Sequence, residues 1–275
     1  MNWKDRFLFV AIPLKSRAVD FACALSLNRL QARIKEGGGY LHIHYECGGG
    51  IVLARNKCMS AAVQSEMTDF LFVDADVSFL PEAVEGLLDS GLDFVAGAYP
   101  CRGTDWDVLF ARIRAGQIKS ADDAAELSAQ LPIRIPDGPF TLHRERYIRA
   151  SHVATGFLYL SRSALCKLAS VSEVIRRVDY AKRTTSIIYN ICSFDLYDTG
   201  ERIKRDEVWR PQCAPNIVNT SPLYEFVGED FYLCDKYRDY CGGEVWIDSA
   251  CKLDHAGESV FSSMTIAHMA ERDLL

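Results

Sequence analysis

The hydrophobic positions of the first hundred residues alternate between short continuous runs and runs with helical spacing. A short continuous apolar run bounded by turn residues is typical of a strand buried on both faces of a parallel sheet. Apolar residues at helical spacing are typical of a helix that packs one side against that sheet. This alternation predicts an α/β domain with a mainly parallel sheet flanked by helices. The expected strands cover 7–12, 40–45, 70–73 and 94–99, and the expected helices cover 18–34, 52–65 and a segment that Pro81 opens and Gly91 stops.

The pattern changes after residue 100. Residues 101–150 contain several prolines and many charges, and they predict an irregular insertion that crosses one face of the domain. A strand returns at 152–160, and a helix capped by Ser161 or Ser163 follows it to about residue 169. The remaining expectations are an irregular segment over 179–222, a helix over 231–239, a strand over 244–248 and a C-terminal helix over 259–275.

The composition excludes several classes of protein. The chain of 275 residues is 49% hydrophobic and 25% charged, which is too apolar for a disordered chain. Its longest clean apolar runs, such as Phe7 to Leu14, have about eight residues, well short of the roughly 20 that a membrane-spanning helix needs. A formal net charge of -6 disfavours nonspecific binding to nucleic acid, because phosphate contacts need clustered lysine and arginine.

The ten cysteines are scattered, with no Cys-x-x-Cys pair, and the closest two are Cys234 and Cys241. A secreted disulfide framework is usually denser, and a zinc site usually shows tight pairs. We therefore expect mostly buried free thiols, because cysteine behaves as a small hydrophobe. The N-terminus also lacks the features of a signal peptide. Together these observations predict a cytoplasmic protein with no transmembrane segment.

Asp74 and Asp76 flank one alanine directly after the buried strand at 70–73. In open α/β sheets, ligands bind at the carboxyl ends of the strands. Two carboxylates placed there repel each other unless a cation lies between them. Oxygen ligands suit Mg²⁺ or Mn²⁺, which also bridge substrate phosphates. We favour such a site over the alternative, a pair of loop acids of which one caps the next helix.

Glu229 and Asp230 form a second acidic pair, just ahead of the helix expected at 231–239. A carboxylate near a metal can act as a general base, although acids at a helix N-terminus are also favoured by the macrodipole. His255 follows a later strand, and imidazole suits Mn²⁺, but a lone histidine is more often a packed or surface residue. Residues 228–258 hold eight acids and three bases, which concentrates most of the net negative charge in this segment.

Two further positions and one basic cluster have both functional and structural interpretations. Arg55 opens the helix before the Asp-x-Asp strand, where it could reach a pyrophosphate, orient Asp74 or form a structural ion pair. Thr155 and Gly156 interrupt the later strand, where a glycine either lets a ligand approach the backbone or forms a bulge. The basic cluster, which we interpret as a solvated face rather than a phosphate site, comprises Arg176, Arg177, Lys182 and Arg183.

Short motifs follow one another along a little over half of the chain. In order they are Ile12-Pro13, Ala54-Arg55-Asn56, Phe70–Asp76, Val95–Pro100, Ala154–Leu160, Gly228-Glu229-Asp230, Gly243–Asp248 and Leu253–Gly257. This order resembles that of nucleotide-sugar-dependent glycosyltransferases of the GT-A fold, in the large inverting family with many bacterial and viral enzymes. The resemblance implies a GT-A-like, Rossmann-type mixed and mainly parallel sheet with irregular insertions, in one catalytic domain over 1–275. Within it, 1–100 would form the nucleotide-binding half, 101–150 an insertion, 151–258 the acceptor and catalytic half, and 259–275 a C-terminal helix.

The same resemblance implies roles for individual residues. Asp74 and Asp76 would hold Mn²⁺ or Mg²⁺, and His255 would complete the metal shell. Asp230 would be the general base on the acceptor hydroxyl, with Glu229 supporting it, and attack would invert the anomeric carbon. The implied donor-binding residues are Ala11, Pro13, Lys15, Arg55, Asp74, Ala75 and Asp76, and the implied acceptor-side residues are Thr155, Gly156 and Trp246.

The expected function is therefore transfer of a hexose from a nucleoside-diphosphate sugar, a UDP-sugar first, to a hydroxyl of a glycan or of a modified base in DNA. A retaining glycosyltransferase is one alternative, and it would not need Asp230 as a base. A phosphohydrolase of the haloacid-dehalogenase type is another, with Asp74 as nucleophile, although that motif usually lies on the first strand. A third alternative is a sugar-nucleotide binder that keeps the fold without turnover.

Overall fold

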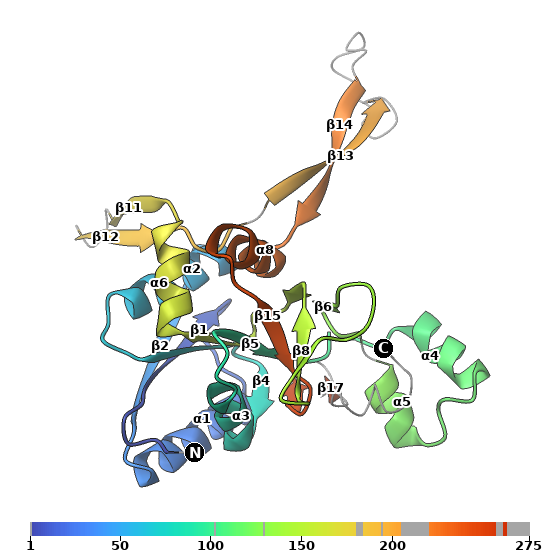
Figure 1. The fold of residues 1–275 in the computed structure, drawn as a ribbon, viewed down its shortest axis with the longest axis horizontal. Helices are drawn as coiled ribbons and strands as arrows, with labels where there is room; N and C mark the ends of the chain where they lie inside the picture. Colours follow the sequence, from blue (N-terminus) through green and yellow to red (C-terminus); the bar gives the residue numbers. More distant parts are fainter. Residues whose placement is uncertain are drawn as a thin grey trace.

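The computed structural model describes residues 2–101, 103–128, 130–179, 184–193, 195–204, 220–256 and 261–262. Figure 1 shows its helices and strands in chain order. The first hundred residues alternate between strand and helix as predicted, with one additional short strand, β4. Their elements are β1 (Phe7–Leu14), α1 (Phe21–Glu36), β2 (Tyr40–Cys47), α2 (Ile51–Val63), β3 (Asp69–Val73), β4 (Val77–Phe79), α3 (Pro81–Asp89) and β5 (Phe94–Gly97).

The second part of the chain contains more regular structure than its sequence predicts. Up to residue 170 it forms α4 (Trp106–Arg114), α5 (Ala121–Leu127), β6 (Ile133–Arg134), β7 (Leu142–His143), β8 (Tyr147–Ala150), β9 (His152–Val153), β10 (Phe157–Ser161) and α6 (Arg162–Ser170). Beyond residue 170 it forms β11 (Val174–Asp179), β12 (Thr184–Tyr189), β13 (Asp195–Lys204), β14 (Thr220–Val227), α8 (Glu229–Cys241), β15 (Val245–Asp248), β16 (Leu253–His255) and β17 (Phe261–Ser262).

The central sheet has eight strands in the order β2-β1-β3-β10-β5-β15-β8-β7. β1 pairs in parallel with β2 and β3, and β15 pairs in parallel with β5. β10 is antiparallel to both of its neighbours, and β8 is antiparallel to β15 and β7. Six strands therefore share one direction, which confirms the predicted α/β class with a mixed and mainly parallel sheet.

Helices cover both faces of this sheet, and alternate residues of each strand face opposite sides of it. Phe70 and Phe72 of β3 pack in one cluster with residues of α2, α6 and α8, whereas Leu71 and Val73 pack in a second cluster with residues of α1 and α3. The continuous apolar run of β3 is thus explained by burial on two sides.

Three local expectations are wrong. The strand expected over 152–160 is two strands, because β9 pairs with β6 while β10 joins the central sheet. The segment 179–222, which the sequence predicts to be irregular, contains β12, β13 and the start of β14. β12 pairs antiparallel with β11, which precedes the segment, and β13 pairs antiparallel with β14, a pair that extends away from the sheet in Figure 1. The insertion over 101–150 contributes β7 and β8 to the central sheet. The helix expected over 259–275 lies outside the described residues, apart from Phe261–Ser262, which form β17.

Two expectations from the composition can be compared with the described part of the chain. No helix there is long and apolar enough to cross a membrane. The nine described cysteines are free thiols, and five of them are buried: Cys23, Cys58, Cys192, Cys234 and Cys251.

Candidate functional site

The Asp-x-Asp motif forms the turn between β3 and β4, at the carboxyl end of β3. Every residue of β3 is buried, whereas the side chains of Asp74 and Asp76 are 23% and 27% exposed. The backbone N–H of Asp74 donates to the Gly156 carbonyl at 2.7 Å, and the N–H of Val77 donates to the Asp74 carbonyl at 3.1 Å. The turn thus carries both carboxylates from the core to the edge of the sheet where α/β proteins bind ligands.

Arg55 lies in α2 and joins the two acidic pairs that the sequence singles out. Its side chain is only 3% exposed, and Nη2 lies 3.2 Å from Asp74 Oδ1 and 3.4 Å from Asp74 Oδ2. Nη1 donates to Glu229 Oε1 at 3.0 Å and also to Asp230 Oδ1. A planar guanidinium with several fixed donors can contact three carboxylates at once. Arg55 therefore connects the end of β3 to the start of α8.

The charges in this cluster are strongly coupled. Burial by itself would lower the pKa of the Arg55 guanidinium, but the carboxylates of Asp230 and Asp74 raise it above its usual value. Arg55 is therefore a permanent cation at this position. Asp74, Asp76, Glu229 and Asp230 still outnumber it, so the cluster keeps a formal negative charge.

Tyr99 lies two residues beyond the end of β5 and is buried beside Asp74. Its hydroxyl lies 3.5 Å from Asp74 Oδ2 and accepts a hydrogen bond from the Gly156 N–H at 3.1 Å. Burial raises the pKa of Tyr99 well above its ordinary value, and the charges of Asp74 and Asp230 raise it further. Tyr99 is therefore a neutral phenol that donates to the first acid of the motif.

Gly156 lets these side chains approach the backbone between β9 and β10. A Cβ added at this position would lie 2.5 Å from Asp74 Oδ2 and would overlap with Tyr99 Oη. No side chain larger than hydrogen fits without displacing them. The groups that approach the backbone here are the side chains of Asp74 and Tyr99, which differs from both sequence interpretations, a ligand or a bulge.

Asp230 lies in the first turn of α8, where the helix dipole stabilises negative charge. Its Oδ1 accepts hydrogen bonds from Arg55 and from the hydroxyl of Thr155, a residue that is fully buried. Among the residues that the structure describes, no group donates to Oδ2, and the side chain is 29% exposed. One oxygen thus fixes the orientation of the carboxylate, and the other can accept a proton.

His255 lies next to Asp76 because β16 pairs with β4. The antiparallel register places His255 opposite Val77, and the Ala256 N–H donates to the Asp76 carbonyl at 2.8 Å. His255 Nε2 lies 3.3 Å from Asp76 Oδ1, and the ring packs edge-on against Tyr99 with centroids 5.2 Å apart. Two of the three predicted metal ligands are therefore in contact.

The other ring nitrogen of His255 determines where its proton lies. Nδ1 is 2.8 Å from the carbonyl oxygen of Pro100. Because a carbonyl oxygen can only accept a hydrogen bond, Nδ1 carries the hydrogen. In a neutral imidazole, Nε2 then has no hydrogen and carries a lone pair. That lone pair faces an acidic oxygen of Asp76, and the contact is favourable only with a proton or a cation between them. Histidines that bind metals commonly donate their other N–H to a backbone carbonyl in this way.

The predicted metal site is only partly assembled by protein side chains. Asp74, the third predicted ligand, is engaged by Arg55 and Tyr99. Within the described ranges, no group of three or more His, Cys, Asp or Glu residues is arranged to hold a metal ion. Asp76 and His255 fit a metal as two ligands, and Mg²⁺ is commonly bound through one or two carboxylates plus substrate phosphates and water.

The other predicted binding residues lie in different surroundings. Ala11 is fully buried in the core, Pro13 is buried, and Lys15 is exposed just beyond β1. Ala75 accepts a hydrogen bond from the Asp20 N–H at 2.8 Å, which ties the loop after β1 to the Asp-x-Asp turn. Trp246 is buried in β15, with its ring 5.9 Å from that of His143. Of the basic cluster, Arg176 is exposed on β11, and Lys182 and Arg183 lie outside the described residues.

Tyr99 is the residue of this cluster whose role the sequence interpretation missed. It belongs to a motif that carried the resemblance, but no function was assigned to it. The signal that could have identified Tyr99 is its position. It is a polar residue just past the carboxyl end of a buried strand, and that strand is the next one predicted after the Asp-x-Asp strand.

No protein-family model matches the chain, and no curated protein matches its sequence. Among solved structures, A197 from STIV aligns over 94% of both chains with 13% identity and a TM-score of 0.44. The 4-diphosphocytidyl-2C-methyl-D-erythritol synthase from Anaerococcus prevotii aligns over 62% of this chain and 80% of its own, with 10% identity and a TM-score of 0.31. TM-scores this low support no conclusion about function, which rests on the residues of the site.

Proposed function

We propose that this chain is a metal-dependent glycosyltransferase that moves a sugar from a nucleoside-diphosphate sugar to a hydroxyl acceptor. The observation that carries the proposal is the juxtaposition of two acidic groups at one edge of the sheet. On one side Asp76 faces the lone pair of His255, and on the other Asp230 is held by Arg55 and Thr155. A cation-binding position beside a proton acceptor suits transfer from a diphosphate donor.

On the donor side, Asp76 and His255 would hold Mn²⁺ or Mg²⁺ together with phosphate oxygens of the donor. The metal would neutralise the charge that develops on the leaving diphosphate. Asp74 would contact the donor, held in place by Arg55 and by the Tyr99 hydroxyl. The loop after β1, tied to Ala75 through Asp20, would line the nucleotide, and UDP is the nucleotide that we expect.

On the acceptor side, Asp230 would act as the general base. Its Oδ2 would take the proton of the acceptor hydroxyl as the oxygen attacks the anomeric carbon. The new glycosidic bond forms while the bond from that carbon to the diphosphate breaks, so the configuration inverts and a nucleoside diphosphate leaves. Arg55 and Thr155 both donate to Oδ1, which fixes the orientation of the carboxylate.

A donor screen tests the proposal. Thermal-shift titrations with UDP- and GDP-sugars, each with and without Mn²⁺, are expected to show metal-dependent stabilisation by one nucleotide. Analysis of the reaction products is expected to show that this nucleotide is released as a nucleoside diphosphate. Phosphate release from a phosphomonoester without any nucleoside diphosphate would contradict the proposal and indicate hydrolysis through Asp74. Metal-dependent binding with neither hydrolysis nor transfer would also contradict it and indicate a sugar-nucleotide binder.

The substitution Asp230→Asn tests the assignment of the base. Transfer is expected to fall by about 10²- to 10⁴-fold, because asparagine cannot take the acceptor proton, while the nucleotide still stabilises the protein. Asp239→Asn is the matched control, because Asp239 is an exposed acid on the same helix and its loss should leave transfer unchanged. Transfer retained in Asp230→Asn would contradict the inverting mechanism and favour a retaining one.

A further inference from the structure

The central sheet ends on one side in β2, which pairs with β1 and with no other described strand (Figure 1). This pairing is parallel and runs without interruption from Phe7 opposite Tyr40 to Leu14 opposite Cys47. The outer edge of such a strand presents unpaired N–H and C=O groups, on which another strand can pair. The outer edge of β2 is therefore a candidate interaction surface.

The hydrogen bonds between β1 and β2 identify the backbone groups that point away from the sheet. The Tyr40 N–H donates to the Arg6 carbonyl at 3.0 Å. In a parallel pair a residue directs both of its backbone groups to the same neighbouring strand, and the direction alternates along the strand. Tyr40 and every second residue after it therefore face β1, whereas Leu41, Ile43 and Tyr45 direct their N–H and C=O groups outwards. None of these three residues forms a backbone hydrogen bond with another residue that the structure describes.

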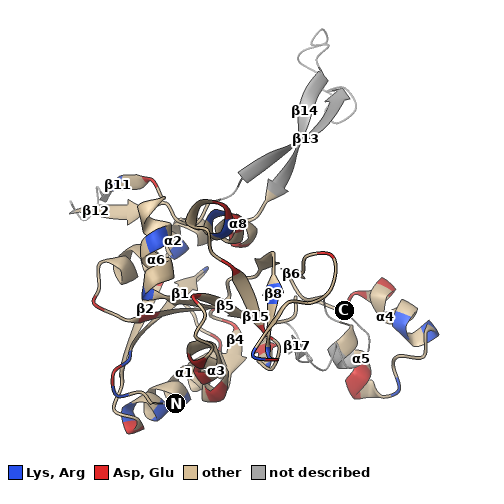
Figure 2. Cartoon of the chain, viewed as in Figure 1, with Lys and Arg blue, Asp and Glu red and all other residues tan. Residues whose placement is uncertain are grey.

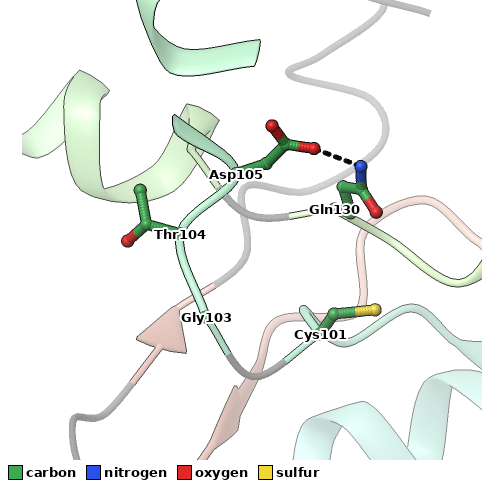
Figure 3. A pocket seen from close by; sticks show the side chains of 5 residues that line it. All are labelled: Cys101, Gly103, Thr104, Asp105 and Gln130. Carbon is green, nitrogen blue, oxygen red and sulfur yellow. Dashed lines mark hydrogen bonds between the residues drawn. The ribbon is translucent and has the colours of Figure 1, made fainter. Parts of the chain in front are cut away.

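The two edges of the central sheet are built differently. The far edge is β7, which has two residues, and a very short edge strand is one way in which proteins prevent unwanted pairing. The insertion that contributes β7 also carries α4 and α5, on the side of the molecule away from β2 in Figure 1, and within it Asp105 accepts a hydrogen bond from Gln130, as Figure 3 shows. β2, by contrast, has eight residues without a proline, a lysine or a bulge. It therefore lacks the features that protect an edge from pairing.

The side chains along β2 also favour contact with another strand. Tyr40 and Tyr45 of β2 are each 50% exposed, and Phe7 of β1 is 45% exposed. β2 contains one acid, Glu46, and no lysine or arginine, in agreement with the mostly tan strand in Figure 2. Glu46 already has a partner in its own chain, because Lys57 Nζ lies 2.7 Å from its Oε2. Covering exposed aromatic side chains beside a strand with little charge is favourable.

A second copy of the chain fits this edge. A two-fold axis perpendicular to the sheet places the two β2 strands antiparallel, and such an interface is closed. The outward-facing groups allow a register centred on His44, which uses almost the whole strand. In this register Ile43 lies opposite the partner's Tyr45, and Glu46 lies opposite the partner's His42, so an acid faces an imidazole and no two carboxylates meet. We infer that this chain forms a two-fold dimer in which the β2 strands join the two central sheets into one.

The helices on both faces of β2 would enlarge the interface. Specific dimers usually bury roughly 1,200–2,000 Å² in total, which is more than two paired strands supply. α2 contacts β2 from one face of the sheet and α1 from the other. Joining the sheets brings these helices close to their counterparts in the second copy. The inference does not depend on the proposed function.

Sedimentation equilibrium of the full chain tests the inference, and a dimer with a Kd of about 10 µM or less is expected. Ile43→Pro removes an outward N–H without removing a hydrogen bond to β1, and Tyr45→Lys places a cation at the junction. Each variant is expected to weaken the dimer about tenfold or more. Leu142→Lys is the matched control, because it places a lysine at a comparably exposed position on the opposite edge strand, β7, and it should leave the association unchanged.

Three outcomes would overturn the inference. The first is a chain that stays monomeric at about 100 µM. The second is a dimer that neither β2 variant weakens, since it would use another surface. The third is equal weakening by Leu142→Lys, because the effect would then not be specific to β2. Melting temperatures close to that of the natural protein show that the variants are folded, and if Ile43→Pro unfolds the chain, the comparison of Tyr45→Lys with Leu142→Lys decides.

Discussion

Two histidine–aspartate pairs lie in different regions of this molecule and invite comparison. His255 Nε2 is 3.3 Å from Asp76 Oδ1 where β16 meets β4. His152 Nε2 is 2.9 Å from Asp235 Oδ1 where β9 meets α8. By residue type and by distance the two pairs are nearly equivalent, so a search for acids near histidines would treat them alike.

The two pairs differ in the hydrogen-bond partner of the other ring nitrogen, Nδ1. His152 Nδ1 lies 3.1 Å from the Ser151 hydroxyl, which can donate or accept, so a neutral His152 can keep its hydrogen on Nε2 and donate it to Asp235. His255 has no such choice, because the Pro100 carbonyl takes its hydrogen on Nδ1. The partner of Nδ1 therefore decides which pair needs an added proton or a cation between its two members.

The surroundings of the two pairs agree with this difference. Asp235 also binds Arg238, one turn further along α8, and the His152 ring packs 4.6 Å from that of Phe231. His152–Asp235 is thus a structural pair closed by protein groups. His255–Asp76 lies beside Asp74 and Tyr99 at the edge where ligands bind. We therefore expect His255–Asp76, and not His152–Asp235, to be affected by the binding of metal and donor.

Replacing the aspartate of each pair should give the largest difference between the two pairs, in the rate of transfer. Asp76→Asn is expected to lower transfer by at least about a hundredfold, because a metal contributes several kcal/mol to stabilising the leaving group. Asp235→Asn should lower thermal stability, since it removes the negative charge that His152 and Arg238 share, but not the transfer rate per folded molecule. Steady-state rates and melting temperatures of both variants measure the contrast. Equal loss of transfer in the two variants would remove the distinction between the pairs.

Removing each histidine should give a smaller contrast, in metal affinity. His255→Asn is expected to weaken Mn²⁺ binding in the presence of UDP by about 10- to 100-fold, since substitutions around a metal commonly cost this much. His152→Asn should leave the Mn²⁺ affinity unchanged, because its ring is turned to Asp235. Calorimetric titration of each protein with Mn²⁺ gives the affinities. An unchanged affinity in His255→Asn would show that His255 is not a metal ligand.

The sequence predicts the first half of the fold well because its strands are buried on both faces. β1, β3 and β5 appear as continuous apolar runs, and the helices between them keep helical spacing. The same reasoning fails for β8, which pairs with β15 almost a hundred residues later. Short strands of this kind depend on distant partners rather than on their own pattern. Local periodicity therefore could not identify them.

The sequence predicts those residues of the candidate site that come directly after a buried strand. The position of Asp74 and Asp76 after a buried strand predicts their place, and in the structure Arg55 contacts both that turn, through Asp74, and Asp230. What the sequence could not supply is the direction of hydrogen bonds. Nothing in the residue order indicates that the Pro100 carbonyl would fix the tautomer of His255, or that Gly156 would make room for Tyr99. Those features arise only when distant segments meet.

The smallest expected effect is a pH dependence of stability from the structural pair. Burial lowers the pKa of His152 below its ordinary value, and the charge of Asp235 opposes this only in part. The unfolded chain then binds the proton first as the pH falls below about 6.5, so the contribution of His152 to stability is present above that pH and is lost as the pH falls through the lower folded-state pKa. Between about pH 7.5 and about pH 5.5, the melting temperature of the natural protein should therefore fall more than that of His152→Gln. His44, whose pKa burial also lowers, titrates in both proteins and cancels in the difference. An identical fall in the two proteins would mean that His152 binds a proton equally well when folded and unfolded, and the description of His152–Asp235 as a neutral-histidine pair would be wrong.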